Sequence, residues 1–218
     1  MLPYHVAVIL GYSIAIAAVI GLIRFGKILP ANQPFVFILW FGLLNHTLSV
    51  FFIHFFGNNS VNSNIYVLAE SLLYLWLFRN WGSLGKKETF FRVLIFLLVV
   101  SWMIDNLVWH KITVVNSFFR ILYSFLLIFL SIEQLNKLIT SARKNLLFNS
   151  TFLICIGVLI YFSYKATIEV FFFIKLKASD RFYINIFVIL VFVNFFVNLI
   201  FAWATLWIPR KQKFISQH

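Results

Sequence analysis

The sequence predicts an all-α integral membrane protein, a bundle of seven transmembrane helices that forms a single domain over residues 1–218. Hydrophobic residues make up 62% of the chain and charged residues 11%, whereas a soluble domain has about 45–50% apolar and about 25% charged residues. The apolar residues gather in seven runs, each close to the ~20 residues that a helix needs to cross a bilayer. The polar segments between these runs are short, so we expect no soluble catalytic module.

The seven expected helices follow one another closely along the chain. Their ranges are 4–23, 34–56, 64–81, 89–109, 114–135, 148–174 and 182–208. Pro34 suits the first turn of its helix, where the missing N–H is not needed, and Pro209 follows the last helix. The N-terminal residues lack the basic region of a signal peptide, so we expect the first run to be retained as a helix. The single cysteine, Cys155, excludes a disulfide within the chain.

The positive charges between the apolar runs predict the orientation of the bundle. One side receives twelve of them: Arg24, Lys27, Arg79, Lys86, Lys87, Arg92, Lys137, Arg143, Lys144, Arg210, Lys211 and Lys213. The other side receives four: Lys111, Lys175, Lys177 and Arg181. Because cytoplasmic loops carry the excess of Lys and Arg, we expect the N-terminus outside and the C-terminus in the cytoplasm. The net charge of +12 then indicates a lipid bilayer as the partner and no nucleic acid. The expected location is a cell membrane, the inner membrane if the source is a bacterium.

Short sequence similarities raise the question of an internal repeat. Residues 47–52 (TLSVFF) match residues 167–172 (TIEVFF), and residues 64–68 (NIYVL) resemble residues 185–189 (NIFVI) at nearly the same offset. A weaker match would add the first and fifth expected helices. Two parallel three-helix repeats joined by an inverting fourth helix would follow, as in some transporters. Chance similarity between segments rich in Phe, Ile and Val is the alternative.

Polar and ionisable side chains inside the expected helices are the strongest indication of a functional site. A charged group at membrane depth costs about 2.5–3.5 kcal/mol on insertion scales, so it normally faces the interior of a bundle and finds a partner there. With the predicted orientation, these groups gather in the middle and the outer half of the bundle. The candidate site residues are Asn45, His46, Glu70, Asp105, Arg120, Ser124, Tyr161, Tyr164, Lys165, Glu169 and Asn194. Together they predict a polar pocket that opens to the outside.

Several of these residues also have an explanation that needs no ligand. Lys165 and Glu169 are one helical turn apart and could pair with each other. Asp105 and His110 could lie in water at the membrane surface, and His46 could be a hydrogen-bonded histidine of the core. The asparagines of the seventh expected helix could serve as hydrogen bonds between helices.

Glu70 and Arg120 are the hardest to explain in this way. They lie well inside different expected helices, and we expect them to form an ion pair. Helical spacing places further polar residues on shared faces: Ser117, Arg120, Ser124 and Ser131 in the fifth helix, Tyr66, Glu70 and Tyr74 in the third, and Asn194, Asn198 and Thr205 in the seventh.

A receptor-like sensor is the function that these observations favour. It would bind a small polar ligand from the outer side and signal to a separate cytoplasmic protein. The signatures Asp-Arg-Tyr and Asn-Pro-x-x-Tyr of G-protein-coupled receptors are absent, and the seventh expected helix has no lysine for a retinal Schiff base. The alternative is a small-solute transporter built from two three-helix repeats, although no expected helix has a proline beyond its first turn to act as a hinge.

An intramembrane hydrolase is the second alternative. His46, His54 and Asp105 would have to supply a zinc site, but the two histidines are about 12 Å apart along one helix. The sequence has no His-Glu-x-x-His motif, glycine-rich phosphate loop or Ser-His-Asp spacing. We therefore predict no catalytic residue, no metal and no cofactor, and an enzyme is the less expected outcome.

Overall fold

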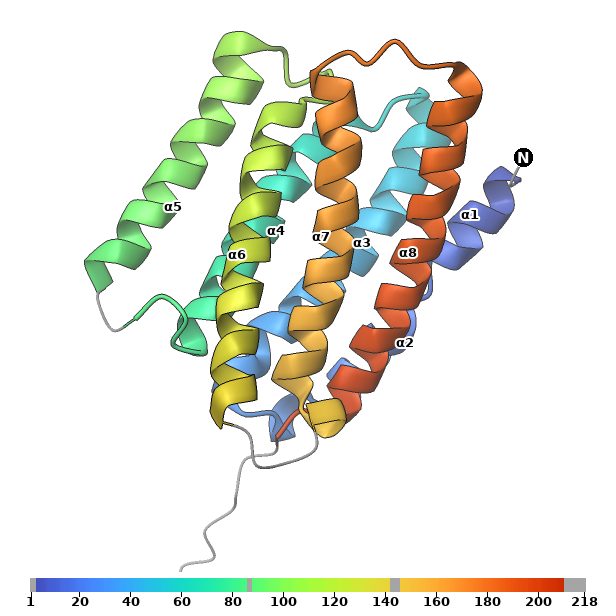
Figure 1. Ribbon diagram of the computed structural model, residues 1–218. Helices are drawn as coiled ribbons and strands as arrows, with labels where there is room; N and C mark the ends of the chain where they lie inside the picture. Colours follow the sequence, from blue (N-terminus) through green and yellow to red (C-terminus); the bar gives the residue numbers. More distant parts are fainter. Residues whose placement is uncertain (1–2, 86–87, 142–145, 210–218) are drawn as a thin grey trace, which may run out of the picture.

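The computed structural model describes residues 3–85, 88–141 and 146–209, and all regular structure within these ranges is helical (Figure 1). The helices are α1 (Tyr4–Gly11), α2 (Ile14–Arg24), α3 (Gln33–Phe56), α4 (Ser60–Asn80), α5 (Glu88–Met103), α6 (Ser117–Ser141), α7 (Ser150–Phe173) and α8 (Asp180–Leu206). A π-helical turn, η3 (Ile104–Trp109), continues α5. Short 3₁₀ turns are η1 (Phe25–Lys27), η2 (Pro30–Asn32) and η4 (Leu146–Phe148). The predicted all-helical class is confirmed.

Within the described residues, six helical segments are long and apolar enough to cross a membrane: Tyr4–Lys27, Pro30–Phe56, Glu88–Trp109, Ser117–Thr140, Ser150–Phe173 and Asp180–Leu206. This composition is compatible with a multi-pass membrane protein. α4 occupies the third expected segment but is not among the six, since it carries Asn62, Asn64 and Glu70. A crossing by α4 and the orientation of the bundle stay predictions.

Seven of the twelve basic residues on which the orientation depends lie outside the described residues: Lys86, Lys87, Arg143, Lys144, Arg210, Lys211 and Lys213.

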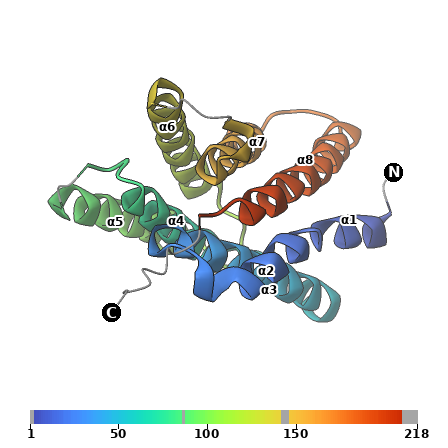
Figure 2. The ribbon, with the colours of Figure 1, turned by 90° about the horizontal axis from the view of Figure 1, so that it is seen from below.

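Two layers of three helices make up the bundle (Figures 1 and 2). α3 packs against both α2 and α4 in one layer, and α7 packs against both α6 and α8 in the other. The layers meet where α2 packs on α8 and where α4 packs on α6. α5 lies beside α4 and α6 at the edge (Figure 2). By these contacts α2, α3, α4, α6, α7 and α8 form a ring, while α5 and α1, which packs on α8, lie outside it (Figure 2).

The first expected helix, residues 4–23, is interrupted, contrary to the prediction. Regular α-helix ends at Gly11 and resumes at Ile14. Between them the amide of Ser13 bonds to the carbonyl group of Leu10, three residues back, at 3.1 Å. Such tighter bonds are those of a 3₁₀ turn, and α1 bends away from α2 there (Figure 1).

A histidine from α3 lies beside this interruption. A Cβ atom added to Gly11 would be 2.2 Å from the imidazole of His46, and the ring of Tyr12 packs edge-on against it with centroids 4.6 Å apart. Ser13 turns inward, where its hydroxyl accepts a hydrogen bond from Asn198 of α8 at 2.9 Å. Contacts with α3 and α8, which no local pattern reveals, therefore interrupt the helix.

Side chains outside the helices determine where α6 and α7 begin. Asp105, in η3, accepts a hydrogen bond from the backbone amide of Phe119 at 2.8 Å. It thereby caps the first turn of α6 from a distant position in the sequence, and the helix begins at Ser117 rather than at residue 114. Asn149 caps α7 by accepting from the amide of Phe152 at 3.1 Å.

The two ends of the bundle differ in how they are filled. We call the end with loops 57–59, 110–116 and 174–179 the mouth end, and the end with residues 25–32, 81–85 and 207–209 the closed end (Figure 1). Toward the closed end, both layers contribute apolar side chains that are at most 1% exposed: Ala17, Ile28, Phe35, Leu75, Phe78, Ile154, Val158, Ala204 and Ile208. This half of the interior is therefore packed and mainly apolar, with a few buried polar side chains such as Ser83, Gln134 and Thr205.

Hydrogen bonds also join the two layers at the closed end. The guanidinium of Arg24 donates to three carbonyl groups at the end of α8, those of Thr205 (2.7 Å), Leu206 and Ile208 (3.0 Å). Ser83, in the turn after α4, donates to the side chain of Gln134 in α6 at 2.6 Å. Separation of the layers at this end would break all of these bonds.

The close approach of α7 to α8 leads to a prediction for stability. A Cβ atom at Gly157 would lie 2.4 Å from the ring of Phe201. We expect Gly157→Ala to lower the free energy of unfolding by about 1–3 kcal/mol, because the helices must move apart. Gly26→Ala is the matched control, since a Cβ atom there meets nothing within 4 Å. Thermal unfolding in detergent measures both, and equal effects of the two substitutions would contradict this packing.

Candidate functional site

Two adjoining cavities lie between the helix layers. The large cavity, of about 620 Å³, is lined by α3, α4, α6, α7 and α8, and by Val115 before α6. The small cavity, of about 180 Å³, is lined by α1, α2, α3, α4, α7 and α8. Asn45, Tyr66 and Tyr161 line both, so these three side chains form the wall at which the cavities adjoin. The large cavity falls within the range of small-molecule sites, about 300–1,000 Å³.

The structure brings most of the candidate site residues to these two cavities. Arg120, Lys165 and Glu169 line the large cavity, and His46, Glu70 and Asn194 line the small one. Asn45 and Tyr161 belong to both.

Glu70 of α4 is the centre of a buried network that joins the two layers. Its carboxylate accepts hydrogen bonds from the hydroxyls of Tyr66 (2.9 Å) and of Tyr123 in α6 (2.8 Å). The ammonium of Lys165 in α7 lies 3.4 Å from the same carboxylate and donates to Tyr123 at 2.5 Å. It also lies 5.4 Å from the ring centre of Tyr161, within reach of a cation–π interaction. Glu70 is 6% exposed and Lys165 is 8% exposed, so both charges are buried and each lies within ion-pair distance of the other.

A second buried ion pair lies nearer to the mouth end. Nη1 of Arg120 is 3.7 Å from Oε1 of Glu169, which is too long for a hydrogen bond. Nη2 of Arg120 donates to Ser63 (2.8 Å) and to Asn64 (3.0 Å), both in α4. Ser117 donates to Oε2 of Glu169 at 2.7 Å. Nε of Arg120 is buried and has no hydrogen-bond partner among the described residues, so this guanidinium keeps unused donors.

These pairings correct one expectation from the sequence, the Glu70–Arg120 pair, and differ from the alternative in which Lys165 pairs with Glu169. Glu70 pairs with Lys165 and not with Arg120, while Glu169 pairs with Arg120 and not with Lys165, its neighbour one turn away. The two charged residues of α7 reach different helices, since Lys165 meets α4 and Glu169 meets the first turn of α6. The sequence identifies the ionisable groups inside the helices, but the choice of partner depends on their level along the bundle. Arg120 meets α4 at Ser63 and Asn64, six or seven residues before Glu70, whereas Lys165 reaches Glu70 itself.

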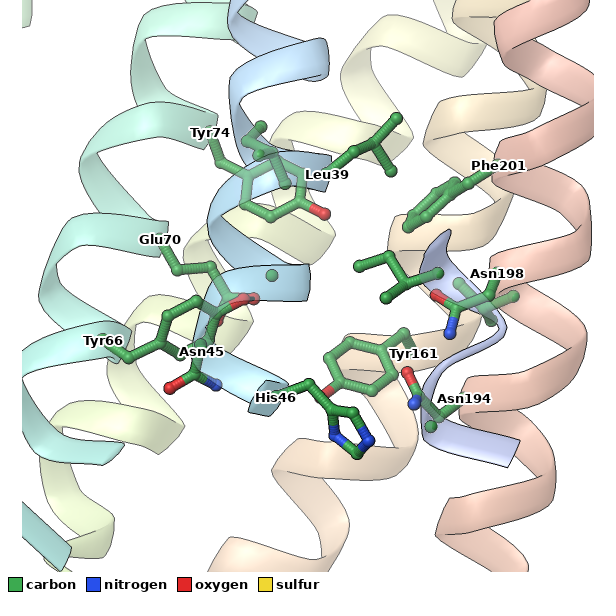
Figure 3. A pocket seen from close by; sticks show the side chains of 15 residues that line it. Leu39, Asn45, His46, Tyr66, Glu70, Tyr74, Tyr161, Asn194, Asn198 and Phe201 are labelled. Atoms are coloured by element: carbon green, nitrogen blue, oxygen red, sulfur yellow. Dashed lines mark hydrogen bonds between the residues drawn. The ribbon is translucent and has the colours of Figure 1, made fainter. Parts of the chain in front are cut away.

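Polar side chains face one another across the small cavity (Figure 3). Glu70, Tyr66 and Asn45 lie on the side of α3 and α4, and Tyr161, Asn194 and Asn198 lie on the side of α7 and α8. Leu39, Tyr74 and Phe201 close the cavity at the end opposite to His46. Nε2 of His46 is 3.1 Å from the carbonyl oxygen of Val8. His46 is thus a hydrogen-bonded interior histidine that also borders the cavity.

The remaining candidate residues lie elsewhere. Asp105 is 0% exposed; it caps α6 and lies 3.1 Å from Nδ1 of His110, so it is not a wetted surface residue. Ser124 donates to a carbonyl group one turn earlier in its own helix at 2.6 Å. Tyr164 donates to a carbonyl group of α8 at 3.2 Å. None of the three lines either cavity described here. Asp105 and Tyr164 each join two segments of the chain, and Ser124 bonds within α6.

Sequence reasoning missed four residues of the network: Tyr123, Ser63, Asn64 and Asn62. Tyr123 is 0% exposed and bridges Lys165 to Glu70, and Asn62 donates to Asn45 at 3.0 Å. Helical spacing relative to the charged residues could have identified two of these four. Ser63 precedes Glu70 by seven residues, and Tyr123 follows Arg120 by three, so each shares a face with a charged residue.

The arrangement supplies donors and acceptors for a bound polar group. Among the described residues, no group of three or more His, Cys, Asp and Glu side chains is placed to hold a metal ion. The two carboxylates and the two cations of the network neutralise one another, and Arg120 and Glu169 each keep hydrogen-bonding capacity toward the large cavity.

A double-mutant cycle tests the pairing. Lys165→Met leaves the carboxylate of Glu70 buried without its cation, so we expect a loss of about 3–5 kcal/mol in unfolding free energy. Glu70→Gln in the same chain should restore much of that loss. The matched cycle combines Glu70→Gln with Arg120→Met and should show weaker coupling. Unfolding in mixed detergent micelles measures both cycles, and stronger coupling to Arg120 would overturn the pairing described here.

Comparison with known proteins adds no further constraint on the site. No model of a known protein family matches the chain, no curated protein matches it, and no solved structure matches it. The function is therefore argued from the geometry of the site itself.

Proposed function

We propose that this protein is a receptor-like sensor in a cell membrane, which binds a small ligand in the large cavity and signals to a separate cytoplasmic protein. The observation that carries the proposal is the contrast between the two halves of the interior. Polar cavities occupy the half toward the mouth end, and packed apolar side chains occupy the half toward the closed end. In the predicted orientation, the mouth end faces the outside.

The rim of the large cavity supports access from the mouth end. Val115, Phe172 and Phe187 line it and are 52%, 40% and 47% exposed. Val115 lies in the loop before α6, and Phe172 lies in the last turn of α7. A ligand at this rim would meet Arg120 and Glu169 next, because these residues stand in the adjoining turns of α6 and α7.

The network offers a way for ligand binding to change the helix packing. Arg120 contacts α4 and α7, and Lys165 contacts α4 and α6. A ligand that replaces Ser63 or Asn64 as a hydrogen-bond partner of Arg120 would remove an interaction between the two layers. Exposed cations at the closed end, such as Lys27 and Arg92, would face the cytoplasm, where they could bind an acidic partner or anionic lipid.

Thiol accessibility in intact cells tests the proposal. With Cys155→Ala as the background, Ser117→Cys and Asn194→Cys introduce thiols into the large and the small cavity. We expect a small charged thiol reagent to label both from the outside only. Thr205→Cys is the matched control, because Thr205 is 0% exposed and lies toward the closed end. If none of the cavity thiols reacts from outside, the cavities are closed and the proposed binding site is wrong.

A small-solute transporter is the second candidate, and the two-layer architecture favours it. Each layer has three helices, and the layers are joined at the closed end by Arg24 and by the Ser83–Gln134 bond. Alternating access would require these bonds to break as the cavities open toward the cytoplasm.

Arg24→Gln distinguishes the two candidates. Loss of hydrogen bonds to a charged donor is worth about 1.5–3 kcal/mol. For a transporter, the substitution should therefore raise labelling of Asn194→Cys from the cytoplasmic side by about tenfold or more. A sensor requires no such opening, so its cytoplasmic labelling should stay at background. Lys27→Gln, an exposed cation three residues later, controls for the loss of a positive charge.

A further inference from the structure

The walls of the large cavity indicate a class of ligand, and this inference rests on the proposed binding function. Its lining includes polar groups from Ser63, Ser117, Arg120, Lys165 and Glu169. It also has an apolar part, to which α7 contributes Ile168 and Phe172 and α8 contributes Phe187 and Leu190. A ligand that is polar throughout would leave this apolar part without a matching surface. The cavity therefore suits a molecule with a polar head and an apolar chain.

The charges around the cavity indicate the charge of the head. Arg120 and Lys165 are balanced by Glu169 and Glu70, each within ion-pair distance of its partner. A head with a net charge would add an unbalanced charge to this interior, where an unpaired charge is strongly unfavourable. An uncharged head avoids that cost.

The unused hydrogen-bonding groups indicate the chemistry of the head. Nη1 of Arg120 and Oε1 of Glu169 are 3.7 Å apart, and neither forms a hydrogen bond among the described residues. Nε of Arg120, a residue that is 6% exposed, is also without a partner there. A ligand group that accepts a hydrogen bond from Arg120 and donates one to Glu169 would satisfy the unused atoms of both side chains. A hydroxyl or a primary amide does this, whereas a carboxylate cannot donate and a quaternary ammonium can do neither.

We propose that the large cavity binds an uncharged single-chain amphiphile. Its hydroxyl or primary amide head lies between Arg120 and Glu169, and its alkyl chain lies along Ile168, Phe172, Phe187 and Leu190. The exposed fractions of Phe172 (40%) and Phe187 (47%) mean that the apolar wall continues to the surface of the bundle. The chain of the ligand can therefore extend from the cavity toward the bilayer.

Three photoreactive probes with the same long alkyl chain test this proposal. The chain carries a diazirine, and only the head differs: a primary amide, a sulfonate or a trimethylammonium. With the full chain in phospholipid nanodiscs, crosslinked peptides are located by mass spectrometry. We expect the amide probe to label α7 and α8 around the cavity about tenfold more than either charged probe. Equal labelling by all three would mean adsorption to apolar helices and would overturn the proposal.

Charge variants test the role of the two head-binding residues. Glu169→Gln leaves a surplus positive charge, so the preference should move toward the sulfonate probe. Arg120→Gln should move it toward the trimethylammonium probe. The double variant restores the balance and should again favour the amide, even if a single variant folds poorly. Arg181→Gln, at the exposed start of α8, is the control and should change nothing. Unchanged selectivity in folded Glu169→Gln would overturn the assignment.

Failure of this inference can be told apart from failure of the proposed function. If thiol reagents reach Ser117→Cys but no probe labels the cavity selectively, the amphiphile is wrong and the binding role stands. If those reagents also fail, both are wrong. Propionamide as a competitor tests the source of the ligand. Propionamide is short and reaches the cavity from water. If it reduced labelling by the amide probe as strongly as an unlabelled long-chain amide does, the role of the apolar wall would be overturned.

Discussion

Pairing of ionisable side chains between the two helix layers is the interaction on which the rest of this structure depends. Lys165 of α7 balances Glu70 of α4, and Arg120 of α6 balances Glu169 of α7. None of these charges could remain in so apolar an interior alone, because an unpaired buried charge is strongly destabilising. Three helices from two layers must therefore stand close together, and their side chains leave a polar space at that level.

The interior is divided into a half that contains the charged groups and a half that is mainly apolar. Where the charged groups meet, tyrosine, serine and asparagine side chains form many of the hydrogen bonds that the ion pairs leave over, but Nε of Arg120 keeps no partner among the described residues. Below them, toward the closed end, the layers meet through apolar side chains such as Phe35 and Phe201, whose ring centres are 5.3 Å apart. The bundle is thus tightly packed toward the closed end and contains cavities toward the mouth end. This asymmetry is common to the sensor and the transporter proposals.

Much of the fold could be predicted from the sequence, because apolar runs of membrane length identify helices directly. The interruption at Gly11–Ser13 could not, since it depends on His46 from another helix. The start of α6 was placed too early for a similar reason: its cap, Asp105, lies in the preceding π-helical turn.

For the site, the sequence showed which ionisable groups lie inside helices, and eight of the candidate residues line the two cavities. It did not show their partners. The Glu70–Arg120 pair was a reasonable inference from residue types, yet Arg120 meets α4 at Ser63 and Asn64, and Lys165 is the cation at the level of Glu70. Tyr123 was missed although it follows Arg120 by three residues and shares its helix face.

If α4 crosses a bilayer, as the sequence predicts, its polar character bears on how the chain is inserted during synthesis. α4 lacks the apolar composition of the other long helices, and the lysine that balances Glu70 follows it by 95 residues. When α4 leaves the ribosome, α6 and α7 have not yet been made. In that case α4 would be stable in the bilayer only after these later helices arrive. Insertion would then be cooperative, since an early segment depends on a late one for its charge partner.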